Sequence, residues 1–320
     1  MDYTETFQNF PMGPKVGEWL GIDQKQNSEF DETKRGEFGD FLLRHIEDAE
    51  VKSEEQLVDL LDELVTMDFP NAALKLADFQ ANIWTRSDFR GSQAEGIAAM
   101  ITGDLGRAEI CFKHAHHAAP EEPAPFTNLV QVLYHDDRLE EADTWLEAGL
   151  NTNPNYYRLW ELVFAVEQKK GKEQDEINAS VYRKAKDLNS WAGFSLASET
   201  DLNGNSQTKA LHLSAFYAQG ERDTEFLIEY TGALGAAGDF EKIPHIYFEA
   251  NKKAGGKELP WRLEMHAAQA YLSMGRHEEF IERANSIIKM KYIPLEVQTY
   301  LKELHAEAEK ELAEAKGKVH

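Results

Sequence analysis

The chain has 320 residues and carries 34 basic against 57 acidic side chains, a net charge of −23. This excess of carboxylates disfavours nucleic acid as the partner, because phosphate backbones are bound chiefly through Lys and Arg. Hydrophobic residues make up 42% of the chain, but no apolar run approaches the roughly 20 residues that a membrane-spanning helix needs. The single cysteine, Cys111, excludes an intramolecular disulfide and fits a reducing compartment. We therefore expect a cytoplasmic protein with no membrane insertion.

Residues 1–52 form the first predicted region, an acidic N-terminal arm or cap. Its apolar residues are separated by glycine, proline and polar residues, so no simple helical period is visible. Two interpretations are open: an irregular segment packed on the first hairpin, or an arm that occupies the groove of its own or a neighbouring molecule. The apolar residues that would make these contacts are Phe7, Phe10, Met12 and Trp19.

A helical region is predicted to begin at Ser53. Ser53 and Gln56 have the spacing of a capping box, in which the serine accepts a backbone N–H and the glutamine reaches back toward the start of the helix. From here to residue 294 the sequence shows recurring helix pairs. The segments that carry them are 57–82, 89–120, 123–154, 160–185 with a two-residue insertion, 191–220 around Gly204, 227–250 and 268–287.

The second and third segments match best, at a distance of 34 residues. Small residues such as Gly96 and Ala108 let two antiparallel helices approach closely, and Phe112 would fill the space between hairpins. Gly103 and Asp137 lie in the stretches where the first helix of each pair must end and the chain reverse.

This pattern resembles the tetratricopeptide repeat (TPR) family, in a degenerate form. The resemblance covers about residues 53–294 and implies an all-α fold, a right-handed superhelical solenoid of about seven antiparallel helix pairs. Residues 295–320 are expected to add a C-terminal capping and solvating helix, because their composition favours a helix whose apolar stripe fades.

In TPR proteins the groove is lined about one, four, eight, eleven and twelve residues after the start of each repeat. Here the best-known TPR ligand site, a two-carboxylate clamp, is not expected, since only Asn128 and, conservatively, Arg158 match it. The predicted stretch of groove is instead apolar with a basic margin, although its apolar side chains would equally suit packing between repeats. Its residues are Arg90, Gln93, Ile97, Met100, Ile101, Asn128, Gln131, Tyr134 and Arg158.

Motifs of catalysis are missing from the sequence. There is no Gly-rich phosphate loop and no His-Glu-x-x-His zinc motif, and the stretch around Ser195 lacks the last glycine of a hydrolase elbow. The three histidines His114, His116 and His117 do not complete a metal site by their spacing, so a solvated or packing role is expected. We predict no catalytic residue, metal or cofactor.

The sequence therefore predicts a non-catalytic scaffold or adaptor that binds a partner peptide or helix in the concave TPR groove. Its own N-terminal arm or a second copy of the chain are further candidate partners. A client-binding chaperone and a regulatory subunit of an enzyme complex are the alternative interpretations.

Overall fold

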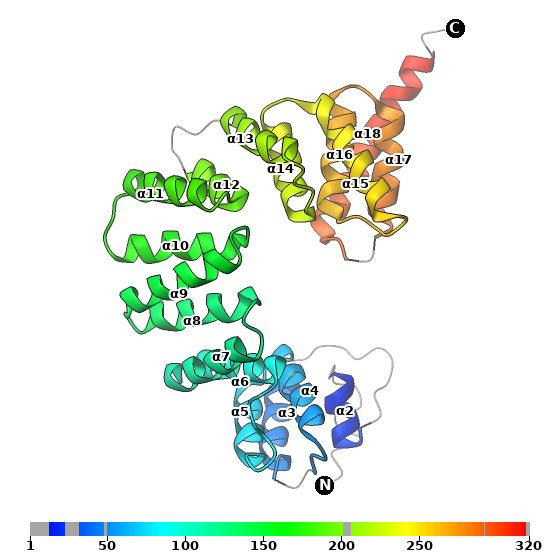
Figure 1. Ribbon diagram of the computed structural model, residues 1–320. Coiled ribbons are helices and arrows are strands. Elements are labelled where there is room, and N and C mark those ends of the chain that lie inside the picture. The colour runs from blue at the N-terminus through cyan, green and yellow to red at the C-terminus, as the bar shows by residue number, and fades with distance from the viewer. Residues whose placement is uncertain (1–12, 23–31, 48–49, 201–205, 291, 318–320) are drawn as a thin grey trace. The chain divides into compact units, whose positions relative to one another are not determined.

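The computed structural model describes residues 13–22, 32–47, 50–200, 206–290 and 292–317, in which all regular structure is helical. The helices divide between two compact units, 1–171 and 172–320. Within each unit, successive helices run back and forth along the chain (Figure 1). No helix in the described ranges is long and apolar enough to cross a membrane.

Unit 1 begins with two helices and continues with three helix pairs and the first helix of a fourth pair. Its helices are α2 (Pro14–Leu20), α3 (Glu32–His45), α4 (Glu54–Thr66), α5 (Pro70–Phe79), α6 (Phe89–Thr102), α7 (Leu105–Ala118), α8 (Pro123–His135), α9 (Leu139–Thr152) and α10 (Tyr157–Lys169).

Unit 2 opens with the second helix of that fourth pair and ends with a single long helix. Its helices are α11 (Gln174–Asp187), α12 (Trp191–Thr200), α13 (Ser206–Ala218), α14 (Thr224–Ala236), the short 3₁₀ turn η1 (Phe240–Lys242), α15 (Ile243–Ala254), α16 (Trp261–Ser273), α17 (His277–Ile288) and α18 (Leu295–Gly317).

In the described residues the helices follow the predicted order of seven pairs, and the all-α repeat fold is confirmed. Six of these pairs each lie within one unit, and the seventh, α10 and α11, is divided by the boundary between the units. The first helices of the pairs are α4, α6, α8, α10, α12, α14 and α16, and each is followed in the chain by the second helix of its pair. The boundary between the two units lies at Gly171, in the turn of the α10/α11 pair. Gly204, in the predicted irregular pair, lies outside the described residues.

The reversals between first and second helices depend on left-handed backbone. Gly103 has φ 85° and ends α6, and Asp137 has φ 63° in the equivalent turn after α8. Both positions were predicted as turns, and glycine adopts this conformation without steric cost. The predicted capping box is also present, since Ser53 Oγ accepts from the Gln56 amide at 3.2 Å. Gln56 Oε1 accepts from the Lys52 amide, one residue before the expected donor.

Packing between the pairs follows the predicted residues. Phe112 is fully buried against Ala99 and Ala108 and against Leu129 of the next pair. A Cβ at Gly96 would lie 2.5 Å from Phe112 Cε1, so the absence of a side chain there is what lets α6 and α7 approach. The role assigned to these residues from the sequence is confirmed.

The N-terminal region is more regular than the sequence indicated. In α3, Phe38 and Leu42 are buried against the first pair, and in α2 Val16 is fully buried. Trp19 packs half-buried against the same core. The described part of this region is therefore helical and covers α4 and α5, whereas Phe7, Phe10 and Met12 lie outside the described residues.

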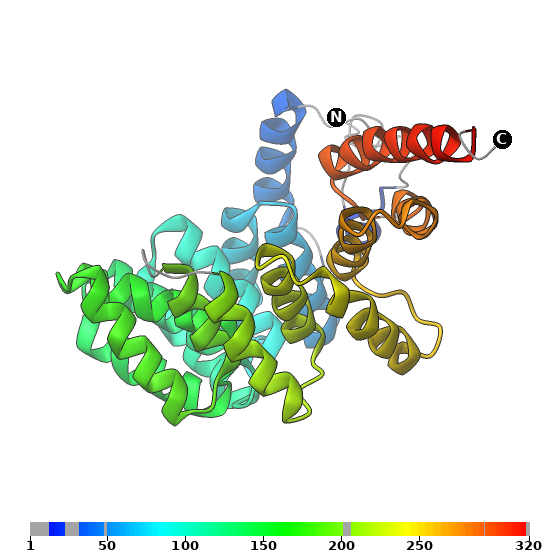
Figure 2. The same ribbon diagram turned by 90° about the horizontal axis from the view of Figure 1, so that it is seen from above.

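The C-terminal helix α18 packs along α17 and closes unit 2. Leu301 and Ala308 of α18 are buried together with Phe280 of α17, whereas Leu295 is 77% exposed. The last turns of α18 extend beyond the neighbouring helices in both views (Figures 1 and 2). One side of this helix is thus a cap, as predicted, and the other faces solvent.

Candidate functional site

The predicted groove positions in unit 1 lie on α6, α8 and α10, and their apolar members are largely used for packing. Ile97 and Met100 are half-buried against the cluster around Phe112. Tyr134 is covered by Lys169, whose Nζ lies 4.4 Å from the ring centroid. Ile101 remains 53% exposed.

The polar groove positions of unit 1 are engaged with neighbouring helices or with their own. Arg90 binds Asp59 of α4 at 2.5 Å, and this guanidinium lowers the pKa of the Asp59 carboxyl. Asn128 donates to the side-chain oxygen of Gln93 at 3.2 Å, which joins α8 to α6.

The two remaining positions differ in their surroundings: Arg158 pairs with Glu161 at 2.9 Å, and Gln131 is half-buried on α8. Asn128, which matches the carboxylate clamp, is thus hydrogen-bonded to Gln93 of the preceding repeat.

The same register points to a different place in unit 2. When positions are counted from the first residue of each first helix, α6, α8 and α10 give the predicted groove residues apart from Asn128. In the same count, α14 and α16 give residues that line two adjoining hollows. These lining residues are Ile228, Gly232, Gly235 and Ala236 of α14, and Arg262, Met265, Gln269, Leu272 and Ser273 of α16.

Side-chain size accounts for this difference between the units. Positions eight, eleven and twelve are Ile97, Met100 and Ile101 in α6, whereas in α14 they are Gly232 and Gly235 followed by an alanine. A Cβ at Gly235 would meet only the Ile243 side chain, at 3.9 Å. Three small residues in a row on one helix face therefore leave a space that bulkier side chains fill in unit 1.

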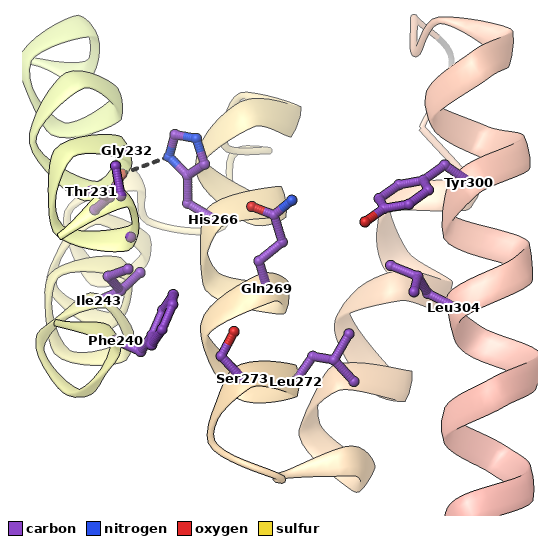
Figure 3. Close-up of a pocket in the computed structure, with 12 residues that line it drawn as sticks. Thr231, Gly232, Phe240, Ile243, His266, Gln269, Leu272, Ser273, Tyr300 and Leu304 are labelled. Atoms are coloured by element: carbon purple, nitrogen blue, oxygen red, sulfur yellow. Dashed lines mark hydrogen bonds between the residues drawn. The ribbon is translucent and has the colours of Figure 1, made fainter. Parts of the chain in front are cut away.

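The first hollow, between α14, α16 and α18, has a volume of about 320 Å³. Phe240, Ile243, Leu272 and Leu304 give it apolar walls. Figure 3 shows that Gln269 of α16 and Tyr300 of α18 extend into the same space from opposite sides. The hollow thus combines apolar walls with a few polar groups, which is the usual composition of a binding pocket.

His266 lines both hollows and carries their best-defined polar atom. Its Nδ1 lies 2.8 Å from Thr231 Oγ1 (Figure 3), and this hydroxyl is 2.7 Å from the Leu227 carbonyl oxygen. The hydroxyl has one proton, which it donates to the carbonyl, so it accepts from Nδ1–H. Burial lowers the pKa of His266, which keeps the ring neutral. Nε2 is therefore a hydrogen-bond acceptor, and no described residue donates to it.

The second hollow, of about 380 Å³, has charged walls. Lys209 binds Glu199 at 2.5 Å and Glu229 at 3.0 Å, and Ser195 donates to Glu229 at 2.8 Å. Two carboxylates thus share one ammonium group. Ser195, the residue of the incomplete hydrolase elbow, is fully buried in the middle of α12.

The other residues considered from the sequence have packing or surface positions. His116 packs edge-on against Phe126 and Trp145, with ring centroids 4.7 and 5.3 Å away, whereas His114 and His117 are exposed. Within the described ranges no three His, Cys, Asp or Glu side chains are arranged to hold a metal ion. Cys111 is fully buried, and burial raises the pKa of its thiol to about 12.

The lining residues of unit 2 were missed for a definable reason. The groove positions predicted from the sequence lie only in the three consecutive repeats that begin at residue 89. The turns at Gly238, after α14, and at Gly275, after α16, show that these two helices have the same register. Position eight of α14 is then Gly232, and this signal is present in the sequence.

No protein-family model matches the chain, and no curated protein matches it in sequence. Among solved structures it is similar to a thermophilic TPR protein of Thermus thermophilus, with 17% identity, 69% of this chain and 100% of that chain covered, and a TM-score of 0.34. It is also similar to a tetratricopeptide repeat protein of Parabacteroides merdae, with 13% identity, 79% and 98% covered, and a TM-score of 0.39. An assembly chaperone of RpL4 is similar with 14% identity, 84% of this chain and 99% of that chain covered, and a TM-score of 0.39.

The fold follows from the chain itself. Helix pairs at the predicted register, with left-handed turns and a buried aromatic between pairs, make this a TPR-like repeat protein. The ligands and partners of these similar proteins are not assigned to this chain.

Proposed function

We propose that this chain is a non-catalytic interaction protein that binds an extended peptide or a helix of a protein partner on the first-helix face of unit 2. The observation that carries this proposal is the agreement between register and shape. The groove positions of α14 and α16 line two hollows that meet at Gly232 and His266. Helical repeat proteins present their first helices to ligands in this way.

A binding role fits the chemistry of these hollows better than catalysis does. The carboxylates of the second hollow are paired with Lys209, and the hydroxyl beside His266 belongs to Thr231, which is fully buried and bonded to backbone. Neither arrangement presents an activated nucleophile to a ligand. A client-binding chaperone or a regulatory subunit would use the same surface and would differ in its partner.

Gly235→Leu tests the proposal, because a leucine at this position projects into the first hollow while its Cβ makes only ordinary contact. Peptides selected from a displayed library on the full chain should lose at least tenfold in affinity for this variant, since the ligand and the new side chain compete for one space. Titration calorimetry gives the affinities. The matched control is Gly106→Leu, the same change at an exposed position of α7 where a Cβ would meet only the Asp104 side chain at 3.9 Å.

A third variant, Tyr134→Glu, tests the face of unit 1 that the sequence favoured. If it abolishes binding while Gly235→Leu does not, the binding surface is on unit 1 and the proposal is wrong. If binding survives both Gly235→Leu and Tyr134→Glu, the ligand binds on neither of these faces, and the proposal is wrong.

A further inference from the structure

We infer that the first hollow of unit 2 takes the indole of a tryptophan presented by a basic peptide. This rests on the proposed function and names the chemistry of the partner. Three observations carry it: the shape and apolar walls of the hollow, the free acceptor on His266, and the unpaired carboxylates that border it.

The walls of the hollow suit a large flat side chain. Phe240 and Ile243 face the hollow from one side and Leu272 and Leu304 from the other, and the α14 side at Gly232 is bare backbone. Tryptophan buries more apolar area than other side chains with a polar atom, and its ring has only two torsions to fix on binding. An aliphatic side chain of smaller area would leave part of this volume empty.

The acceptor selects a side chain that carries a donor. His266 Nε2 is an acceptor because Nδ1–H is bound to Thr231. An indole N–H is a donor only, so it matches this atom, whereas a purely apolar ring would remove Nε2 from water and leave it without a partner. Gln269 and Tyr300, which extend into the same space, can bind the peptide backbone around the anchor.

Charge determines what flanks the anchor. Glu296, Glu303 and Glu307 lie three or four residues from Tyr300 or Leu304 and so share their face of α18. All three are exposed, and none forms an ion pair with a described residue. The second hollow adds no net charge, because its two carboxylates are balanced by Lys209 and Arg262 among its lining residues. A chain of net charge −23 thus places unpaired negative charge beside its pocket, which favours lysine and arginine in the partner.

The test uses short capped peptides on the full chain, with affinities from titration calorimetry. The first peptide has a central tryptophan between lysines. The second replaces tryptophan by benzothienylalanine, which has the same shape with sulfur in place of the ring N–H. The third has glutamate in place of lysine, and the fourth has alanine in place of tryptophan.

We expect the tryptophan peptide to bind about fivefold more tightly than the benzothienyl peptide, as the net gain of one hydrogen bond predicts. The ratio of these two affinities should fall to about one in His266→Phe, which retains an aromatic ring at this position but has no acceptor. The glutamate peptide should bind at least about tenfold more weakly at low salt, and the alanine peptide should give only weak, salt-sensitive binding. Gly235→Leu provides a second variant, in which the tryptophan peptide should drop to the level of the alanine peptide.

A second arm tests the charge on α18. Substituting its three unpaired glutamates by glutamine should reduce the salt dependence of binding, and the same change at three exposed glutamates of unit 1 should not. The control glutamates are Glu121, Glu122 and Glu147.

Three results would overturn the inference: equal affinity for the tryptophan and benzothienyl peptides, a preference for the glutamate peptide, or the same affinities in Gly235→Leu as in the native chain. Its failure is distinguishable from failure of the proposed function. If a library peptide binds in a manner sensitive to Gly235→Leu but is neither basic nor anchored by tryptophan, the function stands and the inference is wrong. If no peptide of either kind responds to that substitution, both are wrong.

Discussion

Gly96 of α6 and Phe112 of α7 are in direct contact, and a Cβ on the glycine would lie 2.5 Å from Phe112 Cε1. The phenylalanine is fully buried between two helix pairs. Substitution by alanine is therefore expected to change stability in opposite directions at Gly96 and at Gly106, which both lie within helices.

Gly96→Ala is expected to destabilise the protein by about 1–3 kcal/mol, the usual cost of overpacking, although alanine is the better helix former. Gly106→Ala is the matched control, and there the propensity gain of up to about 1 kcal/mol is unopposed. Urea denaturation followed by circular dichroism measures both. A stabilised Gly96→Ala variant would show that α6 and α7 do not approach as described.

Glu95 is a fully buried carboxylate that connects three side chains of unit 1. It accepts from Trp84 Nε1 at 2.6 Å, from Arg86 at 2.8 Å and from Arg107 at 2.9 Å. Burial by itself raises the pKa of this carboxyl, but the three donors outweigh burial, and the pKa lies below its usual value. We expect Glu95→Ala to cost about 3 kcal/mol, because two guanidinium groups lose their shared partner.

The lowered pKa of Glu95 also fixes the sign of a pH effect. Its contribution is complete above the unfolded value of about 4.3 and is lost as the pH falls toward the folded value. In Glu95→Gln the free energy of unfolding should therefore decline less steeply below about pH 4.3 than in the native chain. The exposed Glu147 is the control, since Glu147→Ala should change stability by less than about 0.5 kcal/mol.

His116 gives a pH effect in a higher range. Burial, and to a smaller extent the neighbouring His117, lowers the pKa of its ring, which packs between Phe126 and Trp145. As the pH falls below about 6.5 the unfolded chain takes up a proton that the folded chain resists, so stability decreases in that window. His116→Phe should flatten this part of the stability profile, and the exposed His114→Phe should not. Identical slopes for the two variants would contradict the packing of His116.

The N-terminal arm can now be tested at a sharper boundary. Val16 and Trp19 belong to the core of unit 1, so deletion beyond them would damage the fold as well as any arm. Removing residues 1–12 leaves these contacts in place. If Phe7, Phe10 and Met12 compete for the binding surface, as the sequence suggests, this deletion should raise the affinity for peptides, or change the oligomeric state, without lowering the thermal midpoint. Unchanged affinity and unchanged mass in light scattering would remove the arm from the proposed function.

Much of the fold could be predicted because its determinants are local. Turn residues such as Gly103 and the small residues that face Phe112 recur at a fixed period, and period is visible in a sequence. Helix α3 was missed although Phe38, Phe41 and Leu42 have helical spacing, because the glycines and polar residues around them obscured it.

The proposed binding surface was harder to predict because it depends on partners distant in sequence. Tyr134 has the composition of a ligand contact, and only the structure shows that Lys169, one repeat later, lies over its ring. A hollow arises where side chains are small, and Gly232 and Gly235 give no signal of affinity by themselves. Register identified the helix face, whereas the volume left open on it required the packing of three helices.

The boundary between the two units lies at Gly171, so that α10 ends one unit and α11 begins the other. In a repeat protein each helix pair is stabilised by its neighbours, so the pairs of one compact unit are expected to unfold together. We expect two cooperative melting events in calorimetry rather than one. Strain introduced near Phe112 would then shift one melting event and leave the other, together with the proposed peptide binding beside His266, unaffected.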